Sequence, residues 1–119
     1  MTYLEVYQMV STIKKEPGVN IPCAYYMFPE DDPNNPAPPP PFLVYYYPGD
    51  NDFKADDANY QAIRQLTIEL YCDNKDFTLE KAVEDVLSSN GFVYAKSEEY
   101  IDSEKLYMTT FQTEVIING

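Results

Sequence analysis

The chain has 119 residues and a formal net charge of −12, from 8 basic and 20 acidic side chains. This charge makes the chain a poor candidate for binding phosphate backbones, which needs clustered Lys and Arg, and it disfavours anionic membrane surfaces. The chain contains no histidine, which removes the commonest general base and the commonest metal ligand. The length fits one domain, over 1–119, with one hydrophobic core.

The two cysteines, Cys23 and Cys72, indicate the redox compartment. The chain starts MTYLE, without the basic and apolar segments of a secretory signal, and no apolar run has transmembrane length. We therefore expect an intracellular, reduced protein with two buried thiols. A disulfide between them is the alternative.

The first predicted element is a helix over about 3–16. Thr2 and Glu5 have the spacing of a capping box, and apolar side chains recur at helical intervals as far as Ile13. The pair Pro17-Gly18 is expected to end this helix.

Two aromatic strands are expected next, over 21–28 and 42–47. The proline-rich stretch 29–41 lies between them, and we expect it to form a stiff hairpin loop because proline cannot donate hydrogen bonds to a ladder. A ligand for SH3 or WW domains is the alternative interpretation. Such ligands carry basic flanking residues, whereas Asp31 and Asp32 flank this run.

The clearest strand pattern covers 64–72, where apolar and polar side chains alternate. A helix is predicted to follow, with Asp76 or Thr78 as its N-cap and Asn90-Gly91 at its end. The apolar face expected for the strand consists of Leu66, Ile68, Leu70 and Cys72.

The C-terminal part is predicted to contain a strand over 92–96, a polar connection over 97–104 and a strand over 106–118. The resulting order, α-β-β-β-α-β-β, indicates an α+β fold. We expect a mostly antiparallel sheet of four to five strands with both helices packed on one face.

The acidic loop 50–60 has a superficial likeness to a calcium-binding loop. Ala55 stands where that pattern requires glycine, Lys54 occupies a ligand position, and Gln61 replaces the bidentate glutamate. A solvated acidic loop is the simpler interpretation, and a weak cation site is the alternative.

A second set of carboxylates surrounds the helix predicted after residue 76. Helix capping and a solvated helix face account for these groups without catalysis. The sequence therefore predicts no catalytic residue, no metal, no cofactor and no enzymatic activity. The carboxylates concerned are Asp73, Asp76, Glu80, Glu84 and Asp85.

Tyrosine is more abundant in the strands over 21–28 and 42–47 than one small core requires. Side chains alternate across a strand, so at least one of the three consecutive tyrosines at 45–47 faces away from the helices. Tyrosine is enriched at protein interfaces, whereas RNA-binding sheets pair their aromatic residues with basic ones. We therefore predict a subunit or partner interface formed by Tyr25, Tyr26, Pro38, Pro39, Pro40, Tyr45, Tyr46, Tyr47, Asp50, Asp52 and Phe53.

Four stretches, VYYYPG, ADDANY, QLTIELYCDNKD and YIDSEKLY, resemble a known family. They are similar to the tail terminator (tail completion, head-tail joining) proteins of long, non-contractile-tailed phages and prophages of Gram-positive bacteria. The resemblance extends over nearly the whole chain. It implies an α+β sheet with helices on one side and no catalytic site.

The resemblance also implies a structural role in the virion. Proteins of this family form a hexameric ring that ends the tail tube and joins it to the head. The implied partners are further copies of the chain, the major tail tube protein and the head-tail connector protein, with DNA passing through the lumen without specific binding and no membrane contact. The implied place is the head-proximal end of the tail, after assembly in the host cytoplasm. Another connector component such as a stopper, or an acidic inhibitor that mimics DNA, is the alternative.

Overall fold

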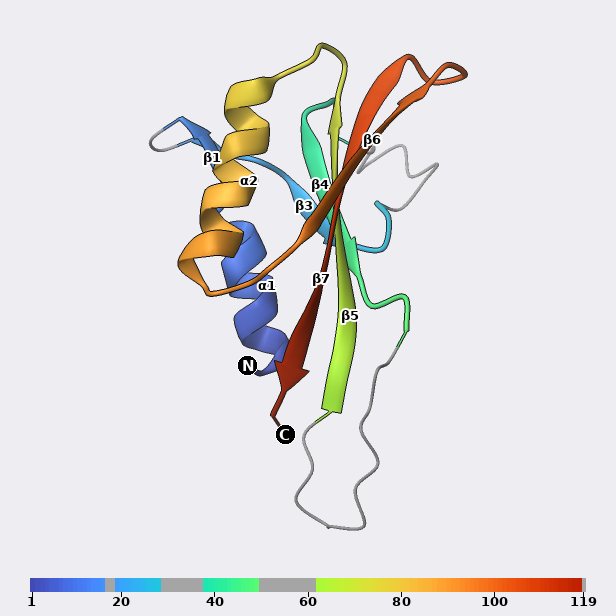
Figure 1. The fold of residues 1–119 in the computed structure, drawn as a ribbon. Coiled ribbons are helices and arrows are strands. Elements are labelled where there is room, and N and C mark those ends of the chain that lie inside the picture. The colour runs from blue at the N-terminus through green and yellow to red at the C-terminus, as the bar shows by residue number, and fades with distance from the viewer. Residues whose placement is uncertain (17–18, 29–37, 50–61, 119) are drawn as a thin grey trace.

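The structure is a computed structural model that describes residues 1–16, 19–28, 38–49 and 62–118. Two helices and seven strands lie within these ranges (Figure 1). They are α1 (Tyr3–Ser11), β1 (Lys14–Glu16), β2 (Val19–Asn20), β3 (Cys23–Tyr25), β4 (Phe42–Tyr46), β5 (Ala62–Cys72), α2 (Phe77–Ser89), β6 (Ala95–Ile101) and β7 (Leu106–Ile117).

Five strands form the main sheet in the order β3-β4-β5-β7-β6, and β1 pairs with β2 in a separate small sheet. Within the main sheet β3 and β4 run parallel, and the three remaining pairs of neighbouring strands are antiparallel. The central pair is the longest, because β5 pairs with β7 from Ala62↔Ile117 to Cys72↔Tyr107. The fold is therefore α+β with a mostly antiparallel sheet, as predicted.

The core lies between the two helices and one face of this sheet (Figure 1). The predicted alternation of β5 is confirmed, because Leu66, Ile68, Leu70 and Cys72 all point into this core. Helix α2 contributes apolar side chains at helical spacing, and α1 does the same from the other end of the layer. Burying one such side chain contributes roughly 1.5–3 kcal/mol to the free energy of unfolding. The helical core residues are Val6, Met9, Val10, Leu79, Val83 and Leu87.

The predicted helix caps are confirmed. The Thr2 side chain accepts a hydrogen bond from the Glu5 backbone N–H at 3.1 Å, and Glu5 accepts from the Thr2 N–H at 2.9 Å. Asp76 caps α2 by accepting from the Leu79 N–H at 3.0 Å. Helix α2 ends at Ser89 with Asn90 as its C-cap, and Gly91 follows with a φ of +81°, a conformation that glycine adopts without strain.

The predicted length of the first helix was wrong, because α1 ends at Ser11 and residues 14–16 form β1. The Thr12 hydroxyl donates to the Met9 carbonyl oxygen at 2.6 Å, and Ser11 donates in the same way to Gln8. Such hydroxyl contacts compete with the next turn of a helix. Ile13 still reaches the core from beyond the helix end.

Two strand predictions were wrong in their extent. The strand expected over 21–28 is limited to β3, and the strand expected over 92–96 lies instead at β6. Strand β6 occupies most of the predicted polar connection, and a turn over 102–105 joins it to β7. An edge strand with both faces largely exposed has no apolar alternation, so the sequence of β6 carries no strand pattern.

The connection between β3 and β4 is a crossover rather than the predicted hairpin, because the two strands run parallel with Cys23 opposite Leu43 and Tyr25 opposite Tyr45. Residues 29–37 of the proline-rich stretch lie outside the described residues. Pro39 is exposed, and the prolines on either side of it are half-buried.

The thiols differ in burial. Cys72 is buried in the core and Cys23 is half-buried, so the prediction of two buried thiols holds for Cys72 alone. The two cysteines do not form a disulfide, as expected. Burial raises the pKa of the Cys23 thiol above its ordinary value.

Candidate functional site

Seven tyrosines gather at the edge of the sheet that β3 and β4 form. Several of their rings are in edge-on or tilted contact, with centroids 5.3 Å apart for Tyr25 and Tyr45, 5.9 Å for Tyr25 and Tyr47, and 5.3 Å for Tyr3 and Tyr47. Such contacts stabilise aromatic pairs beyond the burial of their area. We call this set the tyrosine edge, and it consists of Tyr3, Tyr7, Tyr25, Tyr26, Tyr45, Tyr46 and Tyr47.

The two faces of the sheet share these tyrosines, as the alternation of β4 requires. Tyr45 is buried on the face that the helices cover. Tyr46 lies on the opposite face, where its ring contacts Tyr26 at 5.4 Å and its hydroxyl donates to Glu69 Oε2 at 3.2 Å. The prediction that one tyrosine of this run faces away from the helices is confirmed.

A hollow of about 460 Å³ opens on the helix-covered side of the tyrosine edge. It is lined by four tyrosines and one guanidinium: Tyr3, Tyr25, Tyr45, Tyr47 and Arg64. The Tyr47 hydroxyl is buried, and no hydrogen-bond partner for it exists among the residues that the structure describes. Burial raises the pKa of Tyr47 far above its ordinary value, so this group is a neutral donor. An incoming acceptor could satisfy it.

The rim of this edge is apolar and exposed. Tyr25 is 52% exposed, Tyr26 59% and Met27 57%. Tyr26 has a φ of +69°, which is unfavourable for a bulky side chain, and its N–H donates to the Tyr45 carbonyl oxygen at 2.8 Å. The next N–H, of Met27, donates back to the Tyr25 carbonyl oxygen at 2.8 Å. This turn ends β3 and holds the three side chains in the solvent.

The opposite edge of the sheet, β6, is tied to α2 by ion pairs. Glu80 is buried, with 2% of its surface exposed, although the sequence suggested a solvated helix face. Lys75 approaches Glu80 at 2.5 Å and Lys96 of β6 approaches it at 2.9 Å. Lys75 also pairs with Glu98 of β6. The prediction of a solvated face was wrong for Glu80 because sequence alone did not place two lysines around it.

The charges around Glu80 outweigh its burial. Burial alone raises the pKa of this carboxyl, but hydrogen bonds and charges from Lys75 and Lys96 bring it below its ordinary value. The hydrogen bond to Glu80 raises the pKa of Lys96 in turn. The Glu84 carboxylate also has two partners: the Tyr94 hydroxyl donates to it at 2.9 Å, and the Lys96 ammonium lies 3.5 Å from it.

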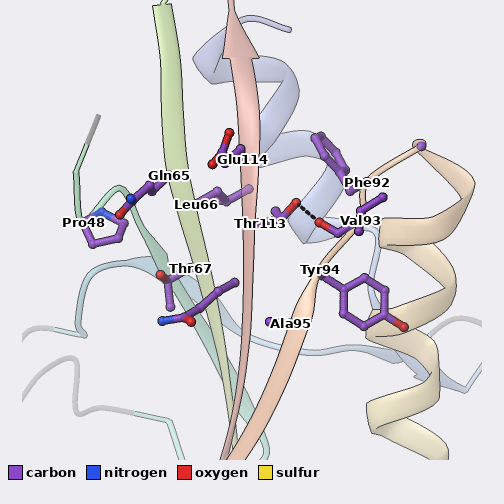
Figure 2. Close-up of a pocket in the computed structure, with 12 residues that line it drawn as sticks. Pro48, Gln65, Leu66, Thr67, Phe92, Val93, Tyr94, Ala95, Thr113 and Glu114 are labelled. Atoms are coloured by element: carbon purple, nitrogen blue, oxygen red, sulfur yellow. Dashed lines mark hydrogen bonds between the residues drawn. The ribbon is translucent and has the colours of Figure 1, made fainter. Parts of the chain in front are cut away.

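A second hollow, of about 630 Å³, lies where β6 begins beside β7 (Figure 2). Gln65 and Thr67 of β5 and Glu114 of β7 line one side, and Val93 and Tyr94 line the other (Figure 2). The Thr113 hydroxyl spans the two sides by donating to the Val93 carbonyl oxygen at 2.6 Å, shown as a dashed line in Figure 2. Its lining contains no thiol and a single carboxylate, that of Glu114.

The structure brings together part of the predicted interface and adds residues to it. Tyr25, Tyr26 and Tyr45 to Tyr47 lie side by side, whereas Asp50, Asp52 and Phe53 lie outside the described residues. Tyr3 and Tyr7 of α1 were not predicted. Their spacing of four residues places them on one helix face, and that was the available signal.

The described residues contain neither a metal-ligand cluster nor a membrane-spanning helix. Within residues 1–16, 19–28, 38–49 and 62–118, no group of three or more Cys, Asp or Glu side chains is arranged to hold a metal ion. No helix in these ranges is long and apolar enough to cross a membrane. The expected absence of catalysis, metals and cofactors stays a prediction.

Comparison with known proteins identifies no family for this chain. No protein-family model and no curated protein matches the chain. A solved structure described as "Virion of native gene transfer agent (GTA) particle" is similar over 80% of this chain and 78% of that chain, with 12% sequence identity and a TM-score of 0.49. A likeness of this size carries no argument about function.

Proposed function

We propose that this protein is a structural component of a phage-type virion that assembles with copies of itself into a ring, ends the tail tube and joins it to the head connector. The resemblance of the sequence to tail terminator proteins suggests the role. The α+β fold, with both helices on one face of a mostly antiparallel sheet, is compatible with it.

The tyrosine edge is the observation that carries the proposal. Soluble monomers rarely expose contiguous apolar patches, and larger patches mark interaction sites. Here Tyr25, Tyr26 and Met27 are each more than half exposed beside a hollow lined by aromatic rings. Tyrosine is also one of the residues that contribute most to binding at protein interfaces.

The net charge of −12 supports association through this surface rather than through most others. Copies with this charge repel each other, so at least one of the two surfaces that meet should carry few carboxylates. The same charge suits a ring through which DNA passes without being held.

The acidic DNA-mimic alternative receives less support from the structure. A mimic presents carboxylates in a row for its target. In α2 the carboxylates have other partners: Glu80 is buried between two lysines, Glu84 accepts from Tyr94, and Asp85 pairs with Lys81 at 3.0 Å.

The proposal is tested by measuring the mass of the purified protein, alone and with the tail tube protein of the phage or prophage that encodes it. We expect a ring, either preformed or formed at the tube end, and electron micrographs in which capped tubes stop growing. The Tyr25→Ala/Tyr26→Ala double variant should fold, as circular dichroism would show, and fail to assemble. A wild-type chain that stays monomeric and leaves tube growth unchanged would contradict the proposal.

A further inference from the structure

We propose that the tyrosine edge of one copy packs against the outer side of β6 of the next copy, which makes the contact head-to-tail. This inference rests on the proposed ring and names the two surfaces that meet. The exposed large apolar side chains in the described part of the chain fall mostly into two groups. One group, Tyr3, Leu4, Tyr7, Tyr25, Tyr26 and Met27, lies on α1 and at the end of β3. The other lies around β6: Phe77 begins α2, Val93 precedes β6 and Tyr100 is in β6. A further exposed residue, Ile116, lies near the end of β7, beyond the part that pairs with β6, and belongs to neither group.

The two groups lie toward opposite ends of one sheet. Strand β3 is the outermost strand on one side and β6 on the other. A closed ring of identical subunits needs two different surfaces on each subunit, since a surface that pairs with itself closes a dimer. A sheet with an exposed contact surface at each end meets this requirement.

The strand directions are also compatible. β3 runs parallel to β4, and the three remaining pairs across the sheet are antiparallel, so β3 and β6 run in opposite directions. Rotation about an axis along the strands preserves these directions. It therefore places β6 of one copy antiparallel to β3 of the next, which is the arrangement with the more favourable pairing.

The chemistry of the two edges is complementary. The tyrosine edge offers neutral hydroxyl donors, including the buried Tyr47 hydroxyl that has no partner in the described residues. The β6 edge offers carboxylate acceptors at Glu98 and Glu99, both exposed. The chain already makes this kind of contact internally, because Tyr71 donates to Glu69 at 3.0 Å and Tyr94 to Glu84 at 2.9 Å.

The same chemistry argues against β6 pairing with β6. Two such edges would bring Glu98 and Glu99 of both copies together, and like charges opposite each other are destabilising. The side chains also match by face. Tyr26 contacts Tyr46 on the open face of the sheet. Glu99 lies on that face too: it is opposite Met108, which is three residues from the core residue Phe111 and therefore on the other face of β7. Tyr25 and Glu98 share the helix-covered face in the same way.

Cross-linking between differently tagged copies tests the contact. In a Cys23→Ser/Cys72→Ala background, one copy carries Tyr26→Cys and the other Glu99→Cys, and a short bismaleimide is added to the assembled protein. We expect a mixed 26–99 product and no 26–26 or 99–99 product. Replacing Glu99→Cys by Lys81→Cys, an exposed site on α2, should abolish the product.

The outcomes separate this inference from the proposed function. If copies assemble and cap tubes but join 26 to 26 or 99 to 99, or give no 26–99 product, the head-to-tail contact is wrong and the ring stands. If the protein stays monomeric with tube protein present, both are wrong. As a second measurement, Glu99→Lys on unlabelled protein should raise the dissociation constant of self-association about tenfold, and Asp85→Lys should leave it unchanged.

Discussion

The two ends of the sheet are finished in different ways. Strand β3 has three residues, is preceded by Pro22 and stops at Tyr26 in a left-handed conformation. Strand β6 has seven residues and belongs to an antiparallel hairpin with β7. Lys96 pairs with Glu80 of α2, and Glu98 pairs with Lys75, which precedes α2. One end relies on packed rings and the other on charge.

This difference shows how a chain can leave two sheet edges accessible without indiscriminate aggregation. Charged side chains on a long edge strand deter pairing with unrelated strands. A short edge followed by a turn offers few backbone groups for pairing, so its contacts come from side chains. An acidic, hydrogen-bond-accepting edge and a neutral, donating edge then select each other more readily than themselves.

The largest expected effect comes from removing Tyr45, the ring of the tyrosine edge that is buried in the core. Tyr45 is buried, and Tyr45→Ala should lower the free energy of unfolding by about 3–5 kcal/mol, because a large buried ring is replaced by a cavity. Denaturant unfolding measures this loss. Tyr45→Phe keeps the ring and should cost less than about 1 kcal/mol; an equal loss in both variants would show that the hydroxyl rather than packing matters.

The next effect tests the charged end. Glu80→Gln leaves two lysines facing a neutral amide and should lower the free energy of unfolding by about 1–3 kcal/mol. Faster hydrogen exchange in β6 than in β5 should accompany the loss, since Glu80 holds β6 through Lys96. Asp85→Asn, in an exposed pair with Lys81, should change stability by less than about 0.5 kcal/mol.

A smaller effect is expected from acid. The folded state holds the pKa of Glu80 below its ordinary value of 4.5, so the protein gains stability from this group above that pH. That contribution disappears as the pH falls through the lowered pKa. Thermal unfolding between pH 7 and pH 3 should therefore show a steeper decline for the wild type than for Glu80→Gln, and parallel curves would contradict the assigned role.

The smallest effect concerns the turn that ends the tyrosine edge. Tyr26→Gly should remain within about 1 kcal/mol of the wild type, because relief of the positive φ offsets the lost contact with Tyr46. Tyr26→Ala loses the same contact without that relief and should be less stable than Tyr26→Gly by about 1 kcal/mol. Urea unfolding of the pair checks the order, and the reverse order would exclude strain at this position.

Where burial is regular, the sequence predicted the fold well. Strand β5 alternates because one of its faces meets the helices, and α2 carries both its N-cap at Asp76 and its terminating Gly91. Strand β7 was predicted within one residue of its end for the same reason. The predictions were wrong where the local sequence pattern is weak. Strand β6 is exposed on both faces, and α1 ends near Thr12, whose hydroxyl contacts Met9, rather than at the expected Pro17-Gly18.

The candidate site was predictable only in part, because it joins distant segments. The consecutive tyrosines at 25–26 and 45–47 could be recognised in the sequence as more aromatic side chains than one small core needs. Their contact with Tyr3 depends on where α1 packs, and the partnership of Glu80 with Lys96 depends on which strand neighbours α2. Neither follows from local periodicity.

The tyrosine edge also gives the protein an optical signal of its own. The chain contains twelve tyrosines and no tryptophan, so its intrinsic ultraviolet fluorescence comes from phenol rings alone. Seven of these rings belong to the tyrosine edge, where several ring centroids lie 5–6 Å apart and only Tyr45 is fully in the core. Covering that surface changes the solvent around a large share of the emitters. Association can therefore be followed in unmodified protein, and a single tryptophan placed elsewhere would serve as a distinct second emitter.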